Sequence, residues 1–163
     1  MADIQFQRAE GDRRAYVLGA VGKVRLSGFL SRAATAEAGG STWRFEHRGF
    51  WQRGVQATDE TGAIVGEFEP RSVRRGGVVR WHGREFTLRP ASSWRERYSF
   101  VQDGRELALF DGKGWGRRPV RVTVDEAASI EPGLLLFTAF IVRRLAEDAN
   151  TTAAAGASTA ATG

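Results

Sequence analysis

The segment Leu134-Leu-Leu-Phe-Thr-Ala-Phe-Ile-Val142 decides the fold of this chain. Glu131-Pro132 precedes it and suits a first helical turn, while Arg143-Arg144 follows it, where cations favour the C-terminal end of the helix dipole. The predicted helix, over residues 132–147, is apolar on nearly every side and therefore belongs in a protein core or in a membrane. An apolar run of about ten residues extends only ~15 Å, about half the hydrocarbon thickness of a bilayer. We therefore expect a core helix.

The rest of the chain has the pattern of an all-β protein. Short apolar runs with a period of two are separated by Gly, Asp and Pro, which is typical of a sandwich or barrel, and about eleven strands can be distinguished. In residues 118–124, for example, Val120, Val122 and Val124 point to one side and Arg121 to the other. Strands of this kind need a common core, which the apolar helix supplies.

Turn residues predict how several strands pair. Asp103-Gly104 and His82-Gly83 each separate two apolar runs and suit two-residue hairpins, and Asp59 to Gly62 suits a longer turn. We expect another pair, formed by residues 43–47 and 50–52. Residues 31–41, rich in Ala, Gly and Ser, are expected to form a loop.

Composition limits the class of protein. The chain has 163 residues, a length typical of one domain, and we predict a single domain over residues 1–148 with a disordered tail of small residues over 149–163. It contains no cysteine, which excludes disulfides, thiolate metal sites and a cysteine nucleophile. The first residues do not resemble a signal peptide, and we expect a cytoplasmic protein without a transmembrane segment.

The combination of many short antiparallel strands with one fully apolar C-terminal helix resembles the tubby C-terminal-like superfamily, and more closely its LURP-one-related and phospholipid-scramblase-like branch. The similar stretch runs from about Trp43 to Leu145 and includes the Asp103-Gly104 turn. The resemblance implies a closed antiparallel barrel of about 11–12 strands around a central helix. It also implies binding of phosphoinositide headgroups or association with membranes, whereas the absence of an acidic calcium loop and of cysteines to acylate argues against lipid scrambling.

Arginine is the most distinctive feature of the surface. The chain carries a formal charge of +5, and eight arginines against two acids lie between Pro70 and Tyr98. Because a guanidinium group binds phosphate oxygens in a bidentate manner, these residues are candidates for binding an anionic ligand. The candidates are Arg71, Arg74, Arg75, Arg80, Arg84, Arg89, Arg95 and Arg97.

The sequence leaves four functions open. The first is a non-enzymatic domain that associates peripherally with anionic phospholipid, and the second is a protein-interaction or scaffold domain whose arginines only keep it in solution. Nucleic-acid binding comes third, because Trp81, Trp94 and Trp115 could stack on bases, although we expect these tryptophans in the core. A hydrolase comes last, since no cofactor motif, metal cluster or nucleophile motif is visible.

Overall fold

The computed structural model describes residues 1–27, 33–48, 54–71, 76–92, 96–112 and 120–159, with side chains up to residue 149. Twelve strands precede one helix, α1 (Pro132–Thr159). The strands are β1 (Ala2–Arg8), β2 (Ala15–Leu18), β3 (Gly22–Ser27), β4 (Ala33–Ala38), β5 (Ser41–Arg48), β6 (Gly54–Asp59), β7 (Ile64–Pro70), β8 (Gly77–Trp81), β9 (Arg84–Pro90), β10 (Arg97–Gln102), β11 (Arg105–Asp111) and β12 (Val120–Val124).

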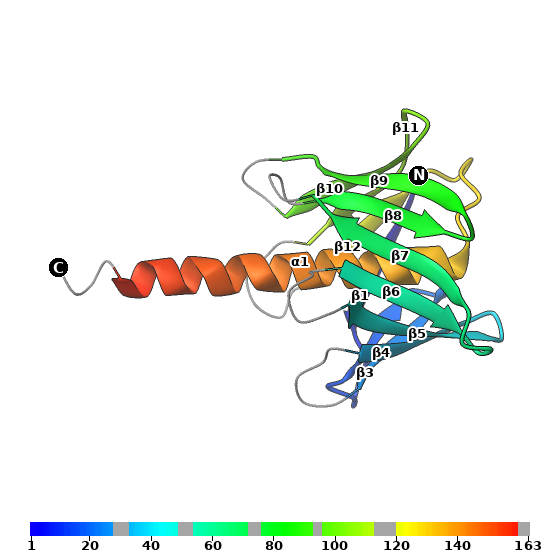
Figure 1. Cartoon of the computed structure of the whole chain (residues 1–163), viewed down its shortest axis with the longest axis horizontal. Helices are drawn as coiled ribbons and strands as arrows, with labels where there is room; N and C mark the ends of the chain where they lie inside the picture. The colour runs from blue at the N-terminus through cyan, green and yellow to red at the C-terminus, as the bar shows by residue number, and fades with distance from the viewer. Residues whose placement is uncertain (28–32, 49–53, 72–75, 93–95, 113–119, 160–163) are drawn as a thin grey trace.

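The strands form one closed antiparallel barrel (Figure 1). Each strand pairs with its neighbours in the sequence, and β1 closes the barrel by pairing with β12, with Ala2 opposite Val124 and Phe6 opposite Val120. A closed barrel leaves no edge strand with unpaired backbone groups. The predicted fold class, an antiparallel barrel of about 11–12 strands around a C-terminal helix, is confirmed.

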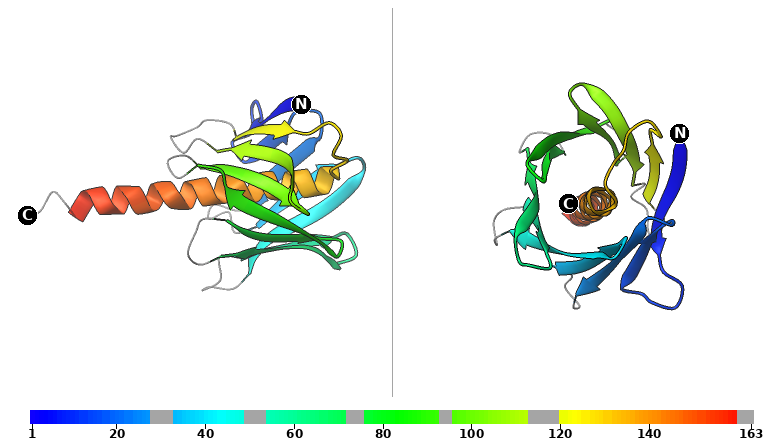
Figure 2. Two further views of the ribbon diagram at one scale, coloured as in Figure 1. Left: turned by 90° about the horizontal axis from the view of Figure 1, so that it is seen from above. Right: turned by 90° about the vertical axis from the view of Figure 1, so that its right-hand side faces the viewer.

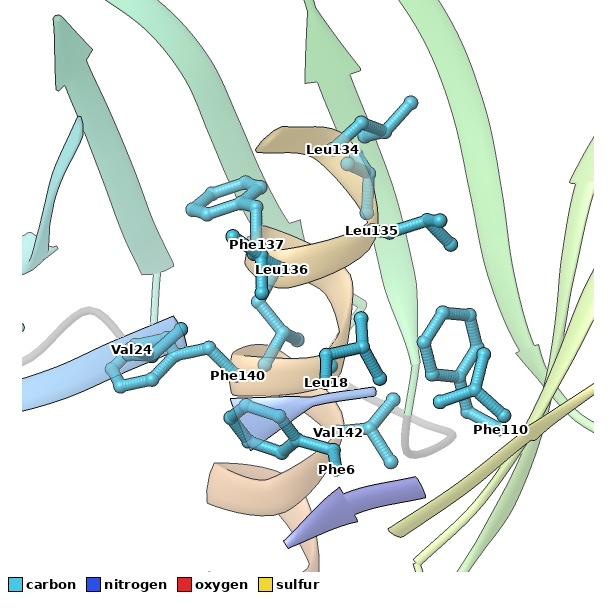
Figure 3. Close-up of a cluster of buried hydrophobic side chains, with 14 of the residues drawn as sticks. Phe6, Leu18, Val24, Phe110, Leu134, Leu135, Leu136, Phe137, Phe140 and Val142 are labelled. Atoms are coloured by element: carbon cyan, nitrogen blue, oxygen red, sulfur yellow. The ribbon is translucent and has the colours of Figure 1, made fainter. Parts of the chain in front are cut away.

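Helix α1 runs along the inside of the barrel (Figure 2). Its side chains from Leu134 to Val142 are all buried, and they meet inward-facing residues of the wall such as Phe6, Leu18 and Phe110 (Figure 3). Around Phe45, the rings of Phe137 and Phe140 lie with centroids 5.1 and 5.6 Å away. The helix is apolar on all sides because the wall surrounds it.

One expected loop is a strand. Residues 31–41 were predicted as a loop, but β4 occupies Ala33–Ala38 and pairs with both β3 and β5. Its buried residues Ala34, Ala36 and Ala38 have small side chains. Close packing explains these small residues, since a Cβ added to nearby Gly22 would lie 2.8 Å from the Cβ of Ala38 and 3.0 Å from Leu136. The alanines of β4 are small because α1 packs closely against the inside of the wall, and they do not mark a turn.

Strand β5 also differs from the expectation. It pairs with β4 and β6, and its partner in β6 is the segment Gly54–Asp59. The expected partner, residues 50–52, lies outside the described residues.

The predicted turns are confirmed. Asp103 and Gly104 have φ of 50° and 80°, and His82 and Gly83 have φ of 48° and 76°, as two-residue hairpins require. The turn after β6 is closed by the Asp59 carboxylate, which accepts hydrogen bonds from the Thr61 hydroxyl at 2.6 Å and from the amides of Thr61 and Ala63.

This turn should make stability depend on pH. The hydrogen bond from the Thr61 hydroxyl, helped by the two amides, lowers the pKa of Asp59 below its ordinary value. A lowered pKa in the folded state means that ionised Asp59 stabilises the fold above the unfolded pKa of about 4, and that this contribution is lost as pH falls through the folded pKa. Carbon-13 titration of the Asp59 carboxyl should give a midpoint below about 4. A higher midpoint, or an unchanged acid dependence of the urea midpoint in Asp59→Asn, would contradict this.

Helix α1 is longer than the sequence suggested. The expected helix ended near residue 147 and was followed by a disordered segment over 149–163, whereas α1 continues to Thr159. The added residues include Ala149 and Ala153-Ala154-Ala155, and alanine has the highest helix propensity of all residues. Nucleation is the costly step of helix formation, and the core already holds the first turns of α1, so residues with high helix propensity can continue it.

The barrel has two different ends. Because neighbouring strands are antiparallel, the odd-numbered strands end where α1 leaves the barrel, which we call the exit end. The even-numbered strands end where α1 begins, which we call the start end. Beyond Ala146, the last buried residue of the described side chains, α1 projects from the exit end (Figure 1).

Candidate anion-binding end of the barrel

The candidate arginines do not form one cluster. Arg71, Arg89 and Arg97 lie at the exit end, beside the ends of β7 and β9 and the beginning of β10. Arg80 lies on the outer wall, and Arg84 lies at the start end. Arg74, Arg75 and Arg95 are outside the described residues.

The surroundings of Arg80 show that it serves the wall of the barrel. Its guanidinium group contacts Glu69 at 3.2 Å and Glu85 at 3.3 Å, on the strands either side of β8. The hydrogen bond to Glu69 raises the pKa of Arg80 above its ordinary value. Glu67 on β7 is likewise paired with an arginine of another strand, since it contacts Arg48 at 2.7 Å. Two carboxylates therefore already neutralise the charge of Arg80, which makes it a poor site for an anionic ligand.

Arg84 is separated from the exit end by the length of the barrel. It donates a hydrogen bond to Gln102 at 2.8 Å, and its guanidinium carbon lies 5.3 Å from the centre of the Phe86 ring. The Arg84 side chain is therefore used in contacts at the start end, where β9 begins.

Arg71 and Arg89 are the most available of the candidates. Both are exposed, and within the described part of the chain neither forms an ion pair. The backbone at both residues is held by hydrogen bonding: the Arg71 amide donates to the Gly76 carbonyl at 3.0 Å, and Arg89 pairs with Ser99 in the β9–β10 ladder. Arg97 is less available, since it lies 3.9 Å from Asp111.

The sequence reasoning missed arginines on the opposite side of the same end. Arg13 and Arg14, both exposed, lie in the connection between β1 and β2. They were missed because a linear count of charge selected residues 71–97, whereas the alternating direction of the strands places the β1–β2 connection at the same end. The exit end therefore carries exposed arginines on two sides of the helix.

Three more arginines contact side chains where the helix leaves the barrel. The Arg143 guanidinium carbon lies 4.2 Å from the centre of the Tyr16 ring, and that of Arg8 lies 5.9 Å from the same centre. Arg144 donates a hydrogen bond to Nε2 of His47 at 3.1 Å. These contacts fix the direction in which α1 projects.

The connections at the two ends differ in charge. At the start end the links 19–21, 39–40, 60–63, 82–83, 103–104 and 125–131 contain five acids and no Lys or Arg. At the exit end the links 9–14, 28–32, 49–53, 71–76, 91–96 and 112–119 contain eleven Lys and Arg and three acids. Eight of the eleven exit-end cations lie outside the described residues, and their number is taken from the sequence alone. The sequences of the connections are therefore basic where odd-numbered strands end and acidic where even-numbered strands end.

Other sites are less developed. A shallow hollow of about 630 Å³ near the start end is lined mainly by small residues, among them Gly19, Ala20, Gly39 and Gly40. Among the residues that the structure describes, no three His, Asp or Glu side chains are placed to hold a metal ion. Trp81 is buried as predicted, with 1% of its surface exposed, while Trp94 and Trp115 lie outside the described residues.

Within the described residues, no helix combines the length and the hydropathy that crossing a membrane requires.

Comparison with known proteins does not assign this chain to a family. No family model, no curated protein and no solved structure matches this chain.

Proposed function

We propose that this protein is a non-enzymatic binding domain that associates peripherally with anionic phospholipid through the exit end of its barrel. The observation that carries the proposal is the set of exposed arginines described at that end, Arg71 and Arg89 on one side and Arg13 and Arg14 on the other, together with the basic sequence of the connections between the strands that end there. A place in the tubby-like superfamily, in its LURP-one-related branch, is part of the proposal and is supported by the barrel that encloses a helix.

The arrangement suits a broad anionic surface better than a single small ligand. The described arginines of the exit end lie on opposite sides of the ring of strands, between β1 and β2 and at the ends of β7 and β9. Each basic residue near an anionic bilayer contributes about 1 kcal/mol, and several together give reversible binding that salt weakens. Binding should therefore be electrostatic and reversible.

The proposal corrects the extent of the site. Arg80 and Arg84, which the sequence grouped with the others, are used by the wall and the start end and are not part of the proposed surface. Arg13 and Arg14 replace them.

We expect the double variant Arg71→Glu/Arg89→Glu to bind anionic vesicles at least about 30-fold more weakly than the wild type, because two contributions of about 1 kcal/mol are lost and repulsion is added. Both side chains are exposed, so the free energy of unfolding should change little. The measurement is sedimentation with vesicles of phosphatidylcholine alone and with added phosphatidylserine, at low and at physiological salt.

The control is Arg84→Glu/Arg105→Glu, which makes the same change in charge at the start end, where β9 and β11 begin. Because Arg105 contacts Asp125, circular dichroism and urea unfolding must first show that this variant is folded. Its binding should stay within a few-fold of the wild type. Equal loss in both variants would show that only net charge matters and would refute a site at the exit end. Sedimentation that single-stranded DNA abolishes would favour a nucleic-acid ligand, and no sedimentation at all would favour a protein-interaction domain.

A further inference from the structure

Helix α1 limits how the exit end can meet a flat surface. It continues beyond Ala146 to Thr159 and, at 1.5 Å per residue, extends about 20 Å from the barrel along its axis (Figures 1 and 2). The Debye length at physiological ionic strength is about 8 Å, so a bilayer that met the tip of α1 head-on would gain little from the arginines at the strand ends. The barrel must therefore approach a bilayer tilted, with one side of the exit end toward the lipid and α1 alongside the surface.

One side of the wall offers arginines for this contact. Strands β9 to β12 and β1, which we call the β9–β1 side, carry Arg89, Arg97 and Arg121 in their exit halves. Arg121 lies between the buried residues Val120 and Val122, so its side chain points away from the core. Arg121 and Arg89 are exposed, and within the described part of the chain neither forms an ion pair. Their charges are available to a ligand.

The acid on this part of the wall neutralises only part of its charge. Asp111 faces Arg97 across the β10–β11 ladder and Arg121 across the β11–β12 ladder. Its contact with Arg97 is 3.9 Å long, and Nε of Arg97 has no hydrogen-bond partner. One carboxylate therefore lies between two guanidinium groups, and the row as a whole stays positive.

The opposite wall, formed by β3 to β6, differs in this respect. Each of the four Lys and Arg residues on these strands has a carboxylate partner within 3.2 Å. The pairs are Lys23–Glu37, Arg25–Asp12, Arg44–Glu46 and Arg48–Glu67.

The sequences of the exit-end connections show the same difference. The three connections between β7 and β12, residues 71–76, 91–96 and 112–119, contain seven Lys and Arg and one acid. The two connections between β3 and β6, residues 28–32 and 49–53, contain two Arg and no acid. Both the described ion pairs and the sequence therefore favour the β9–β1 side as the more positive one.

We propose that the protein lies tilted on an anionic bilayer with its β9–β1 side toward the lipid phosphates. This inference rests on the proposed function and specifies which side of the exit end makes the contact. Arg97 and Arg121 are then central, and Arg89 and Arg13 lie on the two flanks, because β10 to β12 join the two groups of exposed arginines around the ring. Guanidinium groups arranged in this way suit an array of phosphates better than one small anion.

Arg121→Glu should bind vesicles containing phosphatidylserine at least about fivefold more weakly than the wild type, as expected for the loss of one basic residue near an anionic surface. The control is Arg48→Glu, at the exit end of β5 on the opposite wall, which makes the same change in charge. Its binding should stay within about twofold of the wild type, because position 48 lies away from the lipid and is screened. Sedimentation measures both, after circular dichroism has shown that the control is folded without its pair to Glu67.

A distance measurement tests the orientation itself. The chain has no cysteine, so Gln5→Cys and Gln56→Cys can each carry one fluorescent donor. Gln5 lies on β1 opposite Arg121, and Gln56 lies on β6, across the ring; both point outward from the middle of their strands. Energy transfer to vesicles with acceptor-labelled headgroups should be greater from position 5 than from position 56.

The outcomes separate this orientation from the proposed function. If the wild type sediments but Arg121→Glu binds equally well and the two donors transfer equally, the β9–β1 side is refuted and binding through the exit end stands. Greater transfer from position 56 would place the opposite wall against the bilayer and also refute the orientation. If the wild type does not sediment with anionic vesicles at all, the proposed function fails and the orientation fails with it.

Discussion

Leu136→Asp should prevent this protein from folding. Leu136 is fully buried in the middle of the barrel, and a carboxylate there has neither water nor a cation to compensate its charge. Isolated burial of a charge costs several kcal/mol even after relaxation, which is comparable with the total stability of a typical domain of 5–15 kcal/mol. We expect insoluble protein, or soluble protein without the circular dichroism of the wild type and without cooperative unfolding in urea.

The matched control is Ile64→Asp, because it makes the same kind of change at an exposed apolar residue, 55% of whose surface is accessible. It should be soluble, and the urea midpoint should change little. A soluble Leu136→Asp variant with a wild-type spectrum and cooperative unfolding would mean that α1 does not occupy the core. Enclosure by the barrel wall would then no longer explain why α1 is apolar on all sides.

The sequence predicted the helix and the barrel because their signals are local. A helix with no polar face needs an enclosing wall, and Asp103-Gly104 and His82-Gly83 adopt the positive φ values that their residue types favour. Strand β4 was missed because Ala34 and Ala36 have no local strand signal. Their small size follows from the close approach of the wall to α1, which involves residues far apart in the sequence.

The site was predicted less well for a related reason. Strands alternate in direction, so arginines close together in the sequence can lie at opposite ends of the barrel, as Arg84 and Arg89 do at the two ends of β9. Conversely, Arg13 and Arg71 are far apart in the sequence but share the exit end. A count of charge along the chain cannot distinguish these cases until the direction of every strand is known. Once the strands are assigned, each connection can be placed at one end of the barrel according to whether it follows an odd-numbered or an even-numbered strand.

Trp81→Ala should lower the free energy of unfolding by about 3–5 kcal/mol, the usual range for deleting a large buried ring. The Trp81 ring is 1% exposed, and its centroid lies 6.0 Å from that of Trp43 and 5.6 Å from that of Phe137. Its indole N–H donates a hydrogen bond to Glu131 at 2.9 Å, just before α1 begins. The loss would be measured by urea unfolding followed by far-ultraviolet circular dichroism. Trp81→Phe, which keeps a ring but removes the N–H, should cost clearly less.

Gly133 tests whether Trp81 also sets the position of the helix. A Cβ added to Gly133 would lie 2.7 Å from a ring carbon of Trp81 and 2.7 Å from one of Trp43, so Gly133→Ala alone should cost about 1–3 kcal/mol through overpacking. In a Trp81→Ala background, the space vacated by the indole lets Trp43 move away. The double variant should therefore lose less than the sum of the two single losses, by at least about 0.5 kcal/mol. Strict additivity would mean that the two tryptophans do not restrain the start of α1, and that the barrel holds the helix mainly through the contacts further along it.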